Sequence, residues 1–188
     1  MISVTPREVL VFWFVESGIE QWFEKDAAFD AAIRNRFAAA IAAAREGRLQ
    51  HWSEEPKTCL ALIILIDQFS RNVFRDSPLS WSADWRGLAI AKQAIDGGFD
   101  ETLDTDERKF LYMPLMHSED LADQERCVDL FAALKAEDPE GAERSHEYAE
   151  RHRDVVARFG RFPHRNAVLG HKSTDAEIAF LLEPDSSF

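Results

Sequence analysis

The chain has 188 residues, a length that suits one domain and that can bury a sizeable hydrophobic core. Hydrophobic residues make up 46% of it and charged residues 30%, which is ordinary for a soluble globular protein. The formal net charge of -12 argues against a general nucleic-acid binder and against docking on anionic membrane, because phosphate repels an acidic surface.

The cysteines and the apolar segments set further limits. Cys59 and Cys127 lie in apolar helical stretches without CxxC or zinc spacing, so we expect buried reduced thiols and neither a metal nor a cofactor. Arg7 and Glu8 interrupt the N-terminal segment where a signal peptide needs apolar residues. The longest apolar run, 59–66, is far shorter than the roughly 20 residues that span a bilayer. We therefore expect a cytoplasmic protein.

The first two predicted helices are marked by a capping box and by a regular apolar spacing. Thr5 and Glu8, with Pro6 between them, form a capping box that predicts a helix ending at Gly18. A second helix is predicted over 26–45. Four apolar residues recur there at every fourth position and lie along one face: Phe29, Ile33, Phe37 and Ile41.

Four more helices are predicted in the middle of the chain. The helix over 56–69 contains LALIILI, which is apolar on every side, and a helix without a polar stripe is normally surrounded by other helices. Another is predicted over 83–95, and a short one follows Thr105 and ends before Pro114. Ser118 is the predicted cap of the next.

The final helices complete an all-α prediction. One is expected over 140–159, closed by Gly160, and the capping box of Thr174 and Glu177 opens a short last helix. No segment alternates apolar and polar residues well enough to be a strand. Because the connections are mostly short, we expect about eight helices packed as antiparallel hairpins in a single domain over 1–188.

The segment DQFSRN, at 67–72, is the first polar cluster of interest. Asp67 and Arg71 are four residues apart and share a helical face, beside the buried LALIILI run. An unpaired charge there would cost several kcal/mol, so we expect an internal ion pair in a structural network that includes Gln68. Asn72 is predicted to close the helix in a left-handed conformation.

The segment RFPHRN, at 161–166, is the second polar cluster, and it lies in a basic loop that contains no acid. Two interpretations remain open. In the first, the loop is neutralised by the acidic segment SEDLADQE, which contains Glu119. In the second, Arg161, Arg165 and Arg71 converge on an anionic ligand. In either case we expect both clusters to lie in contact with each other or with the segment HSED.

Other candidate groups give weaker signals. His117 and Ser118 are adjacent, so they cannot face one another as base and nucleophile without distortion. Tyr148 and His152 share a helical face, which favours a polar contact over a general base. The tryptophans are expected to pack between hairpins, although such residues also line ligand grooves: Trp13, Trp22, Trp52, Trp81 and Trp85.

Four segments together give the chain a family resemblance: VLVFWF, LALIILIDQFSRNVFR, FLYMPLMHSEDLADQ and RFGRFPHRNAVLG. In this order, and over nearly the whole chain, they resemble the uncharacterised bacterial family called domain of unknown function 924. The resemblance implies an all-helical, tetratricopeptide-like right-handed array with no established reaction. The family's usual form is DQFPRN, with an Arg after the last Leu-Gly. Here Ser70 and His171 occupy those positions, and the second change removes one guanidinium from the possible anion site.

The resemblance also implies a polar centre in which the signature segments meet. Together with the Tyr148–His152 pair, this gives a set of candidate ligand-binding residues: Arg71, Asn72, His117, Glu119, Tyr148, His152, Arg161, His164, Arg165 and Asn166.

Two functional hypotheses follow. The first is a binding or scaffold module that holds a peptide or a small anionic metabolite, and it is favoured because no nucleophile motif is present. The second is an enzyme that uses His117 or His152 as a proton carrier beside Arg71 and Arg165. The sequence leaves the oligomeric state open.

Overall fold

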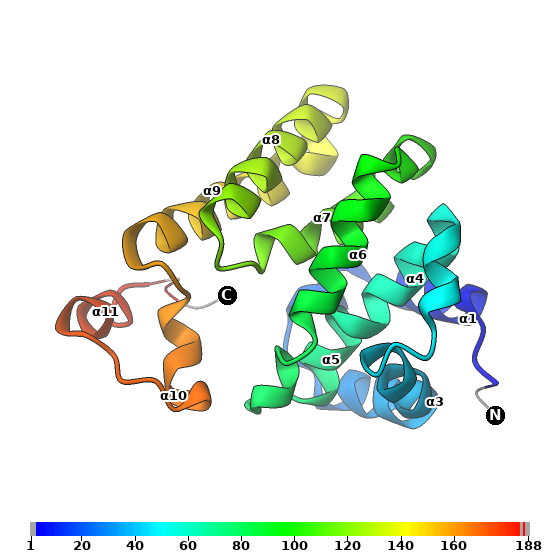
Figure 1. Cartoon of the computed structure of the whole chain (residues 1–188), viewed down its shortest axis with the longest axis horizontal. Coiled ribbons are helices and arrows are strands. Elements are labelled where there is room, and N and C mark those ends of the chain that lie inside the picture. Colours follow the sequence, from blue (N-terminus) through cyan, green and yellow to red (C-terminus); the bar gives the residue numbers. More distant parts are fainter. Residues whose placement is uncertain (1–2, 185, 187–188) are drawn as a thin grey trace.

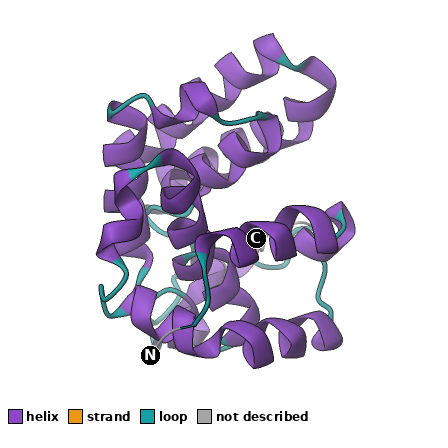
Figure 2. Cartoon of the chain, turned by 90° about the vertical axis from the view of Figure 1, so that its right-hand side faces the viewer, coloured by secondary structure: helices purple, strands orange, loops and turns teal. Residues whose placement is uncertain are grey.

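The computed structural model describes residues 3–184 and 186, and every regular element in that part of the chain is a helix (Figure 1 and Figure 2). The N-terminal elements are α1 (Pro6–Val11), the π-helix η1 (Phe12–Glu16), α2 (Ile19–Phe23), α3 (Ala27–Arg45), η2 (Gln50–Glu54), α4 (Pro56–Ile66) and α5 (Gln68–Val73). They are followed by η3 (Pro78–Ser80), α6 (Asp84–Asp96), η4 (Phe99–Thr102), α7 (Thr105–Met116), α8 (Leu121–Glu137), α9 (Pro139–Phe159), η5 (Pro163–Arg165), α10 (Asn166–Leu169) and α11 (Asp175–Phe180). The predicted all-α class is confirmed.

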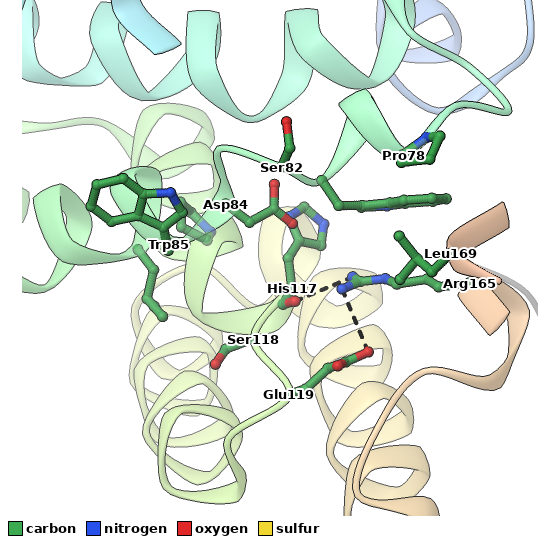
Figure 3. Close-up of a pocket in the computed structure, with 12 residues that line it drawn as sticks. Pro78, Ser82, Asp84, Trp85, His117, Ser118, Glu119, Arg165 and Leu169 are labelled. Carbon is green, nitrogen blue, oxygen red and sulfur yellow. Dashed lines mark hydrogen bonds and ion pairs between the residues drawn. The ribbon is translucent and has the colours of Figure 1, made fainter. Parts of the chain in front are cut away.

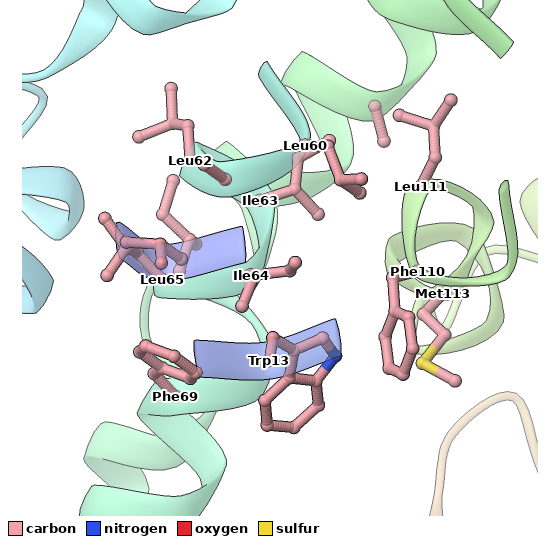
Figure 4. Packing of buried hydrophobic residues seen from close by; sticks show 14 of the residues in the cluster. Trp13, Leu60, Leu62, Ile63, Ile64, Leu65, Phe69, Phe110, Leu111 and Met113 are labelled. Carbon is pink, nitrogen blue, oxygen red and sulfur yellow. The ribbon is translucent and has the colours of Figure 1, made fainter. Parts of the chain in front are cut away.

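Helix α4 lies at the centre of the hydrophobic core. Every residue from Cys59 to Ile66 is at most 1% exposed, as the absence of a polar stripe predicts. Helices α1, α3, α6 and α7 pack around α4. The ring of Trp13 lies edge-on to Phe69 and Phe110, with centroids 5.5 and 5.3 Å away, and so joins η1, α5 and α7 (Figure 4).

The first predicted helix is divided in the structure. The capping box at Thr5 is present, but the α-helical part ends at Val11 and continues as a π-helix to Glu16. The Ser17 hydroxyl donates to the carbonyl of Phe12, which helps to end this turn. Helix α2, which follows, was not predicted because its five residues are too short to show a periodicity.

The helix predicted over 56–69 is also divided. Helix α4 ends at Ile66 and α5 begins at Gln68, with Asp67 between them. The prediction that Asn72 closes the helix in a left-handed conformation is wrong, because Asn72 is helical and its amide donates to the carboxylate of Asp30 on α3. A buried carboxylate on a neighbouring helix is a stronger partner than a local backbone group, and sequence spacing does not reveal it.

Two further helix boundaries differ from prediction. Helix α7 passes through Pro114 and ends at Met116, and its cap is Asp104. Packing in the core holds the segment helical, because its last seven residues are all buried. The cap of α8 is Asp120, whose carboxylate accepts from a backbone N–H, whereas Ser118 lies before it.

The C-terminal part of the chain determines where the candidate site lies. Helices α8 and α9 pack along each other. The segment after α9, residues 161–180, is called here the C-terminal arm. It contains η5, α10 and α11, and α10 and α11 lie below the end of α9 (Figure 1). It has its own small core, formed with α9 by Val155, Val156, Phe162 and Phe180. The tetratricopeptide-like order of the hairpins stays a prediction.

Among the described residues, no helix has both the length and the hydropathy that crossing a bilayer requires.

Candidate functional site

A cavity of about 420 Å³ lies between the C-terminal arm, the segment 78–88 and the end of α7 (Figure 3). Part of its wall is apolar and aromatic, and the rest carries acidic, basic and imidazole groups, a combination typical of small-molecule sites. Its lining residues are Pro78, Trp81, Ser82, Asp84, Trp85, Leu88, Pro114, His117, Ser118, Glu119, Arg165 and Leu169.

Asp67 lies behind this cavity, at the break between α4 and α5, and is 1% exposed. Its Oδ1 atom is 2.8 Å from Nη1 of Arg71 and 2.8 Å from Nδ1 of His117, while Gln68 donates to Oδ2. Burial opposes ionisation of this carboxyl. The charge of Arg71 and the contact with His117 outweigh burial and hold the pKa of Asp67 below its usual range. Asp67 is therefore a buried carboxylate.

Arg71 links this carboxylate to the cavity wall. The predicted ion pair with Asp67 is confirmed, and Nη1 and Nη2 also bind the two oxygens of Asp84 on α6, at 3.2 and 2.8 Å. Burial and the charge of Asp67 raise the pKa of Asp84, although Arg71 acts in the opposite direction. One guanidinium thus compensates two carboxylates, one at the break between α4 and α5 and one at the start of α6.

His117, at the end of α7, lines the cavity beside Asp84 (Figure 3). Burial and the charge of Arg71 lower the pKa of His117, and the nearby Asp67 only partly offsets this effect. The imidazole is therefore neutral near pH 7. Ser118 is engaged elsewhere, since its hydroxyl donates to Asp123 at 2.9 Å, in agreement with the expectation that it does not pair with His117.

Arg165 enters the cavity from the C-terminal arm. Its guanidinium lies 4.4 Å from the ring centroid of Phe162 and 5.7 Å from that of Trp81. Nη2 donates to the backbone carbonyl of His117 at 3.2 Å, and Nη1 is 3.8 Å from Oε1 of Glu119. Burial and the charge of Arg71 lower the pKa of Arg165 to about 10, so it remains a cation at pH 7.

Both polar clusters thus meet the segment HSED, as predicted. Asp67 contacts the side chain of His117, and Arg165 contacts its backbone. The backbone N–H of Phe162 donates to Glu119 at 2.9 Å. Of the acidic segment, Glu119 meets the basic loop, whereas Asp123 pairs with Lys92.

Three other candidate residues have partners outside the cavity. Arg161 binds Glu177 through two hydrogen bonds of 2.6 and 2.8 Å, so the predicted convergence of three arginines is wrong for this residue. Glu177 belongs to the capping box of α11, which lies close to the loop, so its carboxylate is the partner of Arg161. The amide of Asn166 donates to Ser173, and Asn72 lies against α3.

The remaining candidates lie near the cavity without lining it. Nδ1 of His152 is 2.7 Å from the backbone carbonyl of Tyr148, and its ring centroid is 6.4 Å from that of His117. Burial lowers the pKa of His152 to about 3 and that of His164 to about 4, with nearby cations and histidines acting in the same direction. Both imidazoles are neutral at pH 7.

The sequence did not identify the aromatic wall or its acid. Trp81, Asp84 and Trp85 come from the segment 78–88. The tryptophans were expected chiefly to pack between hairpins, with ligand grooves as a second role for all five, and Asp84 was not a candidate. Trp85 is 64% exposed, an unusual value for so large an apolar ring. The pattern that could have indicated this wall is the pair Trp81 and Trp85, four residues apart, with Asp84 between them at the start of a helix.

In the described part of the chain, no group of three His, Cys, Asp or Glu side chains gathers as a metal site. Cys59 and Cys127 are buried and unpaired by any disulfide, and burial raises the pKa of Cys59 to about 12.

Comparisons with known proteins agree with the sequence resemblance. The family described as "Bacterial protein of unknown function (DUF924)" matches residues 9–185. A solved structure of a protein of unknown function from Agrobacterium tumefaciens is 40% identical, with a TM-score of 0.86 over 94% of this chain and 96% of that one. No curated protein matches the chain. The chain belongs to the bacterial family of unknown function DUF924.

Proposed function

We propose that the cavity binds a small organic carboxylate whose body is apolar and carries a ring. The observation behind this proposal is Arg165, a guanidinium that lines the cavity although the residue is only 8% exposed. A buried cation requires compensation. The ion pair with Glu119, at 3.8 Å, supplies part of it, and an anionic ligand can supply the rest.

The hydrogen bonds of Arg165 leave donors available. A guanidinium has five N–H groups, and within the described part of the chain Arg165 makes one hydrogen bond, to the carbonyl of His117 at 3.2 Å. The separation of 3.8 Å from Glu119 is too long for a hydrogen bond, and Nε has no partner among the described residues. Asp84 favours the charged form of Arg165, but its two carboxylate oxygens accept hydrogen bonds from Arg71. A carboxylate matches the geometry of a guanidinium.

The other walls suit the body of such a ligand. Trp85 and Leu88 come from α6, Pro114 comes from α7, and Leu169 comes from α10. Flat aromatic and branched side chains favour a ring over a flexible polar chain. The volume of about 420 Å³ is that of a small-molecule pocket.

The binding experiment compares ligands that differ in one property at a time. Phenylacetate and indole-3-acetate carry both a ring and a carboxylate, benzyl alcohol lacks the charge, and acetate lacks the ring. We expect the first two to raise the melting temperature with dose, and calorimetry to give one site per chain. N-acetyl-phenylalanine and a tripeptide that ends in Phe test whether a peptide carboxylate also enters.

The variant Arg165→Gln tests the role assigned to the guanidinium, with Arg48→Gln as its control. Arg48 carries the same charge in an exposed pair with Glu46. We expect Arg165→Gln to weaken carboxylate binding by about 30-fold or more, as the loss of a buried charged contact does, and Arg48→Gln to bind like the wild type. The proposal fails if none of the carboxylates binds, or if Arg165→Gln binds them as tightly as the wild type.

A further inference from the structure

We infer that His117 is the proton acceptor of this cavity, that Nε2 is its basic atom, and that its substrates are carboxylates with an acidic C–H group near the carboxylate. The inference rests on the proposed function, because Arg165 is assigned to hold the carboxylate. It goes beyond binding by assigning a proton-transfer role to a specific nitrogen.

The contact with Asp67 determines where the imidazole carries its proton. Asp67 is a buried carboxylate that also accepts from Arg71 and Gln68, and a carboxylate can only accept hydrogen bonds. Nδ1 of His117, 2.8 Å from Oδ1, must therefore be the donor. In the neutral ring the lone pair is then on Nε2.

Nε2 is available to a molecule in the cavity. Nδ1 is the one ring nitrogen of His117 that has a hydrogen-bond partner in the described part of the chain. The side chain is 16% exposed, and the residue lines the cavity. A lone pair at the wall of a cavity can accept a proton from a bound ligand.

The base has no protein nucleophile to activate among the described residues. Ser118 donates to Asp123. Ser82, the other serine of the wall, accepts from Arg45 at 2.7 Å and donates toward the carbonyl of Leu79. Both cysteines are buried outside the cavity lining. The arrangement therefore fits proton removal from the ligand itself and does not fit a Ser-His-Asp triad.

The step requires no additional reactant. A C–H bond of the ligand breaks, its proton moves to Nε2, and the electron pair remains on the ligand as an enolate. Asp67 balances the new imidazolium, and the cationic Arg165 stabilises the enolate. The charged or titratable groups around the ring are Asp67, Arg71, Asp84, Glu119, His152, His164 and Arg165.

The first experiment needs no ligand. In full-length protein labelled with ¹⁵N in histidine, long-range ¹H–¹⁵N NMR spectra at pH 7 distinguish the two neutral tautomers and the imidazolium, and His117→Gln identifies the signal. We expect a neutral ring that is protonated on Nδ1. A ring protonated on Nε2, or an imidazolium at pH 7, would overturn the inference.

The second experiment uses phenylpyruvate, which has a carboxylate, a ring and an acidic CH₂ group. Exchange of its CH₂ protons for deuterium in D₂O is followed by NMR. We expect exchange by the wild type to exceed that by His117→Gln about 100-fold, within the usual range for general acid–base catalysis. His51→Gln, which changes an exposed histidine, should match the wild type.

The variants separate this inference from the binding proposal. Because Arg165 contacts the backbone of His117, we expect His117→Gln to bind phenylpyruvate within about threefold of the wild type, and Arg165→Gln to lose both binding and exchange. Equal exchange by bound wild type and His117→Gln refutes the inference while the binding proposal stands. If phenylpyruvate does not bind, the binding proposal fails for this ligand. The NMR experiment then tests the protonation of His117 by itself, and a ring protonated on Nε2 still refutes the inference.

Discussion

At the scale of single residues, Arg71 connects the core to the candidate site. Asp67 and Asp84 are both buried or half-buried, they lie on different elements, and Arg71 binds both. Asp67 in turn fixes the orientation of His117. Arg71 therefore supports both the fold and the site, so we expect its substitution to lower stability.

We expect Arg71→Gln to lower the free energy of unfolding by about 3–5 kcal/mol, because it leaves buried carboxylates without their cation. The exposed pair of Arg48 and Glu46 provides the comparison, and Arg48→Gln should cost less than about 1 kcal/mol. Urea melts of both variants measure the difference. Similar losses for the two would show that Arg71 is not structurally important.

At the scale of elements, α4 is the centre of the packing, and its end places Asp67. Helices α1, α3, α5, α6 and α7 rest on or beside α4, as do the shorter elements η2 and η4. The chain breaks its helical path at Asp67 and resumes as α5. The exact position of this break decides whether the carboxylate reaches His117, so rigid packing of α4 also preorganises the site.

We expect Leu62→Ala or Ile66→Ala to lower the free energy of unfolding by about 2–5 kcal/mol, the usual cost of a cavity in a packed core. Leu182→Ala, at a side chain that is 83% exposed, should cost less than about 0.5 kcal/mol. Denaturant melts test both. A loss below about 0.5 kcal/mol for the α4 variants would contradict the central position of this helix.

At the scale of the whole molecule, three separate segments bring neutral histidines together. His117 comes from the end of α7, His152 from α9 and His164 from the C-terminal arm. The pKa of each is lowered first by burial. The next cause that lowers it is the charge of Arg71 for His117, the neighbouring His117 for His152 and the charge of Arg165 for His164. These three histidines are thus harder to protonate in the folded protein than in the unfolded chain.

This arrangement predicts a loss of stability in mild acid. An unfolded histidine takes up its proton near pH 6.5, whereas folded His152 does so only at about 3, so the free energy of unfolding falls as the pH drops below about 6.5. Between pH 7.5 and 5 we expect His152 to contribute a loss of about 2 kcal/mol.

Urea melts at both pH values test this expectation. His152→Gln should reduce the pH-dependent loss by that amount, while His51→Gln, at an exposed position, should retain it. Relief of repulsion in the acidic chain affects all variants alike and cancels in the comparison. Equal pH dependence for the two variants would contradict the assignment.

The candidate site was predictable only in part. Five site residues were identified from polar segments and from the family resemblance. The structure places His117, Glu119 and Arg165 in the wall of one cavity. Asp67 and Arg71 do not line it; Asp67 contacts His117 and Arg71 contacts Asp84 of the wall. The aromatic wall from the segment 78–88 was not identified, and Arg161 was assigned to the wrong partner, because each depends on contacts that local spacing does not encode.

The sequence by itself determined the helical class, the central position of α4, the capping boxes at Thr5 and Thr174, and the pair of Asp67 and Arg71. These features depend on residues three or four positions apart and on the apolar character of one helix, so local geometry is sufficient to predict them. Only the tertiary structure decided that a carboxylate, an imidazole and a guanidinium meet. His117 is 50 positions from Asp67 and 48 from Arg165, and contacts at that separation exist only once the helices have packed.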